Sequence, residues 1–60
     1  MTLHEHRAFV IGTDGRVQDR HDLICENEAE ARERAERLMN GHDIELWQLD
    51  RILAVFRHKA

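Results

Sequence analysis

Only one segment of this 60-residue chain has the repeat of an amphipathic helix, and strand-like segments flank it on both sides. Its small and apolar residues recur at helical spacing: Ala29, Ala31, Ala35, Leu38 and Met39. One helix covers only one face of a sheet. The chain must therefore leave the other sheet face to water, to its own N-terminal segment or to a partner.

The segment before the helix predicts a β-hairpin. Residues 7–11 are β-branched and aromatic, and the Gly-Thr-Asp-Gly turn at 12–15 tolerates the backbone angles of a tight reversal. The second arm, residues 16–24, alternates weakly and is rich in charge, which suits the edge of a sheet. We expect residues 1–5 to form a frayed tail.

The limits of the helix are also predicted locally. Asn27 and Glu30 have the spacing of a capping box, in which side chains satisfy the free amide groups at a helix start. Gly41, after Asn40, is a natural left-handed stop. Three acid-to-arginine pairs at i, i+4 mark a solvated helix face, and each is worth only about 0.2–0.5 kcal/mol: Glu28 with Arg32, Glu30 with Arg34, and Glu33 with Arg37.

Residues 43–49 and 52–57 predict a second hairpin around Asp50 and Arg51, with large apolar residues on both faces of its arms. In the first arm, strict alternation separates Ile44 and Leu46 from Trp47 and Leu49. In the second arm it separates Ile52, Ala54 and Phe56 from Leu53 and Val55.

The predicted fold is therefore α+β, in one small domain spanning residues 1–60. Its plan is ββαββ, with a four-stranded antiparallel sheet in the order 2-1-3-4 and one helix packed on one face. The uncovered face is predicted to be an interface between two copies, because monomers seldom leave such a patch in water. Its predicted residues are Trp47, Leu49, Leu53 and Val55. Joining of two sheets through the fourth strand, or covering of the patch by the segment with Leu3, are the alternatives.

Composition excludes several classes of function. Twelve acidic residues against nine basic ones give a net charge of -3, which disfavours nucleic-acid binding. The longest apolar run is residues 52–56, far short of the roughly 20 residues that span a membrane. The sequence has no serine or tyrosine, which removes most covalent hydrolase chemistry, and a single cysteine suits a reducing compartment. We expect a cytoplasmic protein that is not an enzyme.

The candidate chemical groups are four histidines and one cysteine. His4 and His6 point the same way from an extended strand, as two ligands of a metal would. His21 lies near Asp19 and Asp22, and His42 is beside Asp43, pairings that can support acid-base chemistry. Cys25 would be activated at a helix N-terminus, although a buried thiol in the core is the simpler interpretation. We predict no catalytic, cofactor or metal site among these residues.

Two further patterns are weaker. The glycine turn at 12–15 leads into a polar strand and not into a helix, so it is interpreted as a turn and not as a phosphate loop. Five arginines would form an anion-binding or acidic-protein-binding surface only if the fold gathers them: Arg7, Arg16, Arg20, Arg51 and Arg57.

The whole chain resembles a group of short uncharacterised bacterial proteins with a strand-strand-helix-strand-strand plan. The resemblance lies in residues 7–11, Asp14-Gly15, residues 20–23, the Glu/Ala/Arg helix and the stretch 41–47. It implies the fold and no activity. A separate segment is similar to the helix entry of HicB-type antitoxins, and this similarity implies a toxin partner; it lies in Asp22, Leu23, Cys25, Ala31, Ala35 and Leu38.

The function class that these observations favour is a noncatalytic protein-interaction module that self-associates as a homodimer. The alternatives are a small-ligand or metal-binding protein that uses the histidines and Cys25, and an antitoxin-like regulator.

Overall fold

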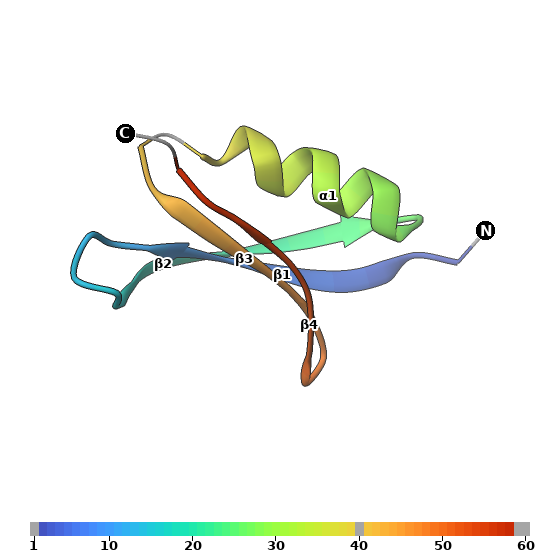
Figure 1. Cartoon of the computed structure of the whole chain (residues 1–60). Coiled ribbons are helices and arrows are strands. Elements are labelled where there is room, and N and C mark those ends of the chain that lie inside the picture. The colour runs from blue at the N-terminus through green and yellow to red at the C-terminus, as the bar shows by residue number, and fades with distance from the viewer. Residues whose placement is uncertain (1, 40, 59–60) are drawn as a thin grey trace.

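The computed structural model describes residues 2–39 and 41–58 and contains four strands and one helix among them. The elements are β1 (His4–Ile11), β2 (Val17–Cys25), α1 (Glu28–Arg37), β3 (Asp43–Gln48) and β4 (Arg51–Phe56). The strands form one antiparallel sheet in the order β2-β1-β3-β4, and α1 lies across one of its faces (Figure 1). The predicted fold class, strand order and helix placement are confirmed.

The core lies between α1 and the sheet and is built from small and aliphatic side chains. Alternate residues of β1 and β3 point toward the helix, because successive side chains of a strand lie on opposite faces. The alanines of α1 let the helix approach the sheet closely. The buried apolar residues are Ala8, Val10, Cys25, Ala31, Ala35, Ile44 and Leu46.

The first strand begins earlier than the sequence predicts. β1 starts at His4, and His4 and Glu5 pair with Cys25 and Ile24 of β2. The prediction of a frayed tail is therefore wrong at these two residues, while Met1 lies outside the described residues. Pairing with the far end of β2 orders a segment that has no periodic pattern of its own.

The helix begins as its cap predicts. The Asn27 side chain accepts a hydrogen bond of 2.8 Å from the Glu30 backbone N–H. The reciprocal bond is shifted by one residue, because Glu30 accepts from Glu26 N–H at 3.1 Å and not from Asn27 N–H. All three predicted acid-arginine pairs of α1 form, with N–O distances of 2.7 to 2.8 Å.

The helix ends differently from the prediction. Its C-cap is Leu38, whose N–H reaches the carbonyl of Ala35. Gly41 does adopt a left-handed φ of 81°, but it lies in the turn before β3 and not directly after the helix. Asn40, named in the same prediction, lies outside the described residues.

The glycine turn between β1 and β2 is confirmed as a turn. Gly12 and Gly15 are joined by a backbone hydrogen bond of 2.9 Å, and Gly15 has a positive φ of 81°. Asp14 accepts from the Arg16 N–H at 3.0 Å, which satisfies a backbone group inside the turn. The strand β2, and not a helix, follows the turn.

The second hairpin contains an irregularity that the sequence does not predict. Leu46 pairs with Ala54, but Trp47 pairs with Ile52, so Leu53 is an extra residue in β4. This bulge places Ile52 on the same face as Trp47 and lets Leu53 pack against the core. The strict alternation predicted for residues 52–56 is therefore wrong at Ile52 and Leu53.

Candidate interaction surface

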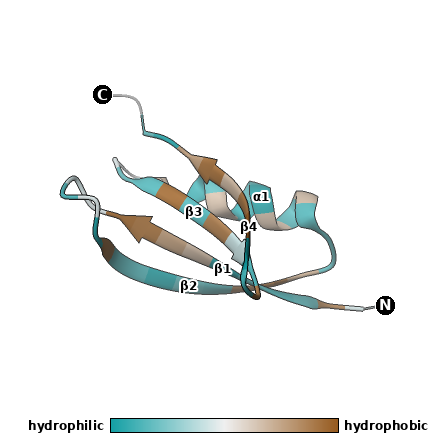
Figure 2. Ribbon diagram, turned by 60° about the horizontal axis from the view of Figure 1, so that its bottom comes forward, coloured by the Kyte–Doolittle hydropathy of each residue, from teal (hydrophilic) through white to brown (hydrophobic). Residues whose placement is uncertain are grey.

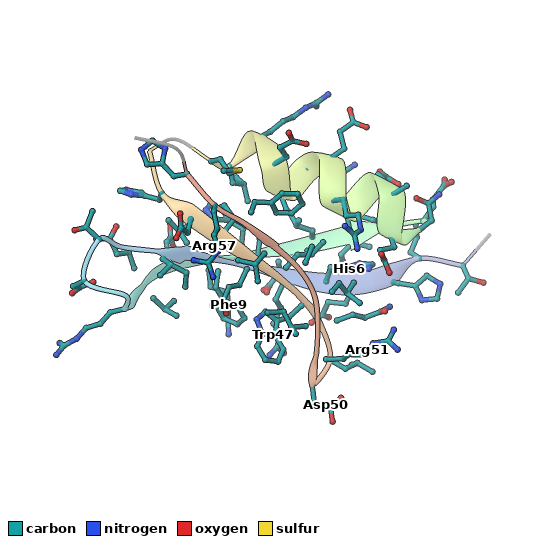
Figure 3. All side chains as sticks on the ribbon, in the orientation of Figure 1. His6, Phe9, Trp47, Asp50, Arg51 and Arg57 are labelled. Atoms are coloured by element: carbon teal, nitrogen blue, oxygen red, sulfur yellow. The ribbon has the colours of Figure 1, made fainter. Side chains whose placement is uncertain are left out.

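The sheet face opposite α1, called the open face here, is defined by two central rows of paired residues. In one row Arg7 pairs with Trp47, which in turn pairs with Ile52. In the next row Phe9 pairs with Glu45, and Glu45 with Val55. Cross-strand partners share a face, so all of these side chains lie together. Figure 3 shows Phe9 and Trp47 pointing away from the helix.

An aromatic pair lies at the centre of the open face. The rings of Phe9 and Trp47 meet edge to face, with centroids 6.3 Å apart and planes at 85°, an arrangement that the ring quadrupoles favour. The Trp47 indole N–H donates to Glu45 Oε1 at 3.1 Å. Both aromatic side chains are half-buried, and Trp47 is held in one orientation by two contacts.

Two of the four predicted interface residues lie on this face. Trp47 and Val55 are on the open face, and Val55 is 45% exposed. Leu49 lies in the β3–β4 turn and is 83% exposed. The prediction is wrong for Leu53, because the bulge in β4 turns this side chain toward the core.

The sequence prediction missed Phe9 and Ile52 as members of the open face. Ile52 is 44% exposed and extends the apolar area along β4. The signal for Phe9 is its alternation with the buried Ala8 and Val10. No comparable signal exists for Ile52, because its placement depends on the bulge.

Charged residues of both signs surround the apolar centre. Arg7 lies 3.8 Å from Glu5 and Arg20 lies 3.6 Å from Asp22, in ion pairs whose side chains are about half exposed. Figure 2 shows that β2 is mostly hydrophilic, in contrast to the apolar stretches of β1, β3 and β4. The open face therefore combines a central apolar area with neighbouring ion pairs of acidic and basic residues.

On both edge strands, side chains form hydrogen bonds with backbone groups. On β2, Asp19 accepts from the Arg20 N–H at 2.8 Å. On β4, the carbonyl of the bulged Leu53 accepts from Arg32 Nη2 at 3.1 Å. Bulges and charged side chains of this kind deter the addition of another strand to a sheet edge.

The two histidines near the N-terminus lie in different surroundings. His6 is only 1% exposed and lies on the helix-covered face, with Nδ1 3.1 Å from the His4 carbonyl oxygen. Because a carbonyl only accepts, that nitrogen carries the proton. His4 itself is exposed. Within residues 2–39 and 41–58 no three His, Cys, Asp or Glu side chains are grouped to hold a metal ion.

The other histidines lie apart from one another. His21 is 3.5 Å from Asp19 on the edge of the sheet, where both side chains are largely exposed. His42 and Asp43 line an open hollow of about 280 Å³ with His58 and the glycine turn. Asp43 Oδ1 accepts from the His58 backbone N–H at 2.6 Å, and His42 Nδ1 is buried with no partner among the described residues.

Cys25 is a core residue and not an activated thiol. It is fully buried at the end of β2. Burial raises the pKa of its thiol, the nearby Arg34 charge opposes this rise, and Glu30 adds to it. A thiol with a raised pKa is a poor nucleophile near neutral pH.

The five arginines are not gathered into one site. Arg7 and Arg20 lie on the open face and pair with neighbouring acids, and Arg16 lies 4.0 Å from Asp14 at the first turn. Arg51 is the first residue of β4, and Arg57 directly follows its last residue (Figure 3). The fold therefore does not build an anion site from these side chains.

The structure defines a small α+β protein with one helix on a four-stranded antiparallel sheet. Comparison with protein-family models, curated proteins and solved structures finds no match to this chain. The only helix of the described residues is too short and too polar to cross a membrane.

Proposed function

We propose that this protein is a noncatalytic interaction module that forms a homodimer by packing its open face against the open face of a second copy. The observation that carries the proposal is an apolar centre on a face that no helix covers, formed by the half-buried Phe9 and Trp47 and the exposed Ile52 and Val55. Leu3 does not cover it, since that side chain is 58% exposed.

The small core fits this proposal. The chain has few large core residues, because three of its seven buried apolar residues are alanine. Burial in a dimer adds to the stability that so small a core supplies.

The edges of the sheet favour face packing over strand addition. A dimer joined through β4 would need the backbone groups of that strand, and the bulge at Leu53 together with Arg32 interrupts them. Asp19 interrupts β2 in a similar way. The sheet face, in contrast, is free of such obstacles in the described residues.

The noncatalytic part of the proposal rests on how the reactive groups are held. Cys25 and His6 are buried, and His21 lies 3.5 Å from the exposed Asp19. Nucleophilic catalysis needs an activated nucleophile. Burial raises the pKa of the Cys25 thiol, which lowers its reactivity near neutral pH.

Sedimentation equilibrium tests the dimer directly. We expect the wild-type chain to sediment at twice its 7.1 kDa mass in the micromolar range, and Val55→Lys to sediment at the single-chain mass. Leu3→Lys is the matched control, because Leu3 is at least as exposed but lies outside the sheet. A wild-type protein that stays at 7.1 kDa throughout that range contradicts the proposal.

The hollow lined by His42, Asp43 and His58 favours small-ligand binding as a second candidate. It contains two imidazoles and does not include Cys25. Titration calorimetry with zinc or nickel tests the metal version, and an absence of binding heat sets that version aside. The antitoxin hypothesis requires a toxin protein on the open face in place of a second copy, which co-purification from the native host would reveal.

A further inference from the structure

We propose that the two-fold axis of this dimer runs along the line between Phe9 and Trp47, so that Arg7 of each copy pairs with Glu45 of the other. The inference rests on the proposed function and specifies its geometry. It follows from the arrangement of four neighbouring side chains at the centre of the open face.

These four residues form the corners of a small rectangle. Arg7 and Trp47 are partners in one row of the β1–β3 ladder, and Phe9 and Glu45 are partners in the next row. One diagonal of the rectangle therefore joins the two aromatic rings, which are in contact. The other diagonal joins a basic residue and an acidic one.

Two-fold symmetry limits how this rectangle can pack against the same rectangle of a second copy. The axis lies in the plane between the two faces. A residue on the axis faces its own equivalent, and a residue on one side of the axis faces the residue at the mirrored position on the other side. An axis along the Arg7–Glu45 diagonal brings like charges together, which is strongly unfavourable in a buried interface.

An axis parallel to the strands, between β1 and β3, places Glu45 on Phe9, and an axis perpendicular to them places Glu45 on Trp47. Both place the carboxylate against an aromatic side chain and without a basic partner, so its desolvation is offset by the Trp47 indole N–H but by no opposite charge. Only the aromatic diagonal brings the four rings together and pairs both carboxylates with guanidinium groups.

Arg7 has the freedom that this arrangement requires. Its ion pair with Glu5 is long, at 3.8 Å, and its side chain is 45% exposed. Strand spacing and residue rise place the aromatic diagonal about 35° from the strand direction, so the strands of the two copies cross at roughly 70°. That angle is near the orthogonal class of sheet packing.

Charge reversal tests the axis. We expect Arg7→Glu and Glu45→Arg each to weaken the homodimer by roughly 100-fold, because each single change makes two like-charge contacts. An equimolar mixture of the two variants should associate as a heterodimer with near wild-type affinity, because both contacts are then between opposite charges. The double variant should also form a homodimer of near wild-type affinity.

Arg20→Glu is the matched control, because Arg20 lies on the open face but outside the rectangle, and we expect a change of less than about 5-fold. Recovery in the mixture also shows that the single variants are folded. If the wild type is a dimer that Val55→Lys dissociates, but the mixture does not recover, the axis is wrong and the open-face dimer stands. If the wild type is a monomer, both proposals fail.

Discussion

The centres of the two sheet faces differ in the size of their apolar residues. On the helix-covered face the buried residues are alanines, aliphatic residues, Cys25 and His6, and Phe56 of the edge strand β4 packs partly buried against them. The open face holds both of the large aromatic side chains placed on the sheet centre, Phe9 and Trp47, and leaves them half-buried. Small residues allow close approach of the helix, whereas large flat ones suit a broad contact with another sheet.

Truncation of one large residue on each face is the strongest way to test this difference. Leu46→Ala removes a fully buried side chain beneath α1 and should lower the free energy of unfolding by about 2–5 kcal/mol. Val55→Ala, on the half-exposed open face, should cost less than about 1 kcal/mol in the monomer. Urea unfolding at low protein concentration measures both, and equal losses would show that the two faces do not differ in this way.

Enlarging an alanine tests the close approach of the helix. Ala35→Leu adds volume to a fully packed site between α1 and the sheet, and we expect a loss of about 1–3 kcal/mol. Ala29→Leu is the control on the exposed side of the same helix, where the substitution should be nearly neutral. A neutral result at position 35 would mean that the core has room for a larger side chain.

A substitution in the turn between β3 and β4, which lies outside both sheet faces, should have a smaller effect on the free energy of unfolding. Leu49 has a φ of 55°, a left-handed conformation that costs energy for a branched side chain, and it is 83% exposed. Leu49→Asn should therefore raise the free energy of unfolding by about 0.5–1 kcal/mol. Asp50→Asn is the control, with a change within about 0.5 kcal/mol, and equal effects of the two variants would argue against backbone strain.

The smallest effect is expected from ionisation of Cys25 on the covered face. Its folded-state pKa is raised by burial, so the unfolded chain loses the thiol proton first. Its contribution is thus fully present below the pKa of the unfolded thiol and is lost as pH rises toward the folded value. Urea unfolding of wild type and Cys25→Ala across mildly alkaline pH should show a steeper decline for wild type, and parallel curves would contradict this.

Much of the fold was predictable because the signals are local. The β-branched and aromatic residues 7–11, the cap at Asn27 and the helical acid-arginine pairs depend on neighbours within a few residues. The interface residues were only partly predictable. Trp47 and Val55 follow simple alternation, but Leu53 departs from it because β4 contains one extra residue opposite β3.

By itself, the sequence determined the order of the elements and the presence of a single helix, since periodicity and capping act over short distances. It also determined that some apolar residues would lie on a face without a helix. The tertiary structure alone decided that His6 is buried, that Ile52 joins Trp47 on the open face, and that Phe9 lies edge-on against that indole. These outcomes depend on the register between strands far apart in the chain, which no local pattern specifies.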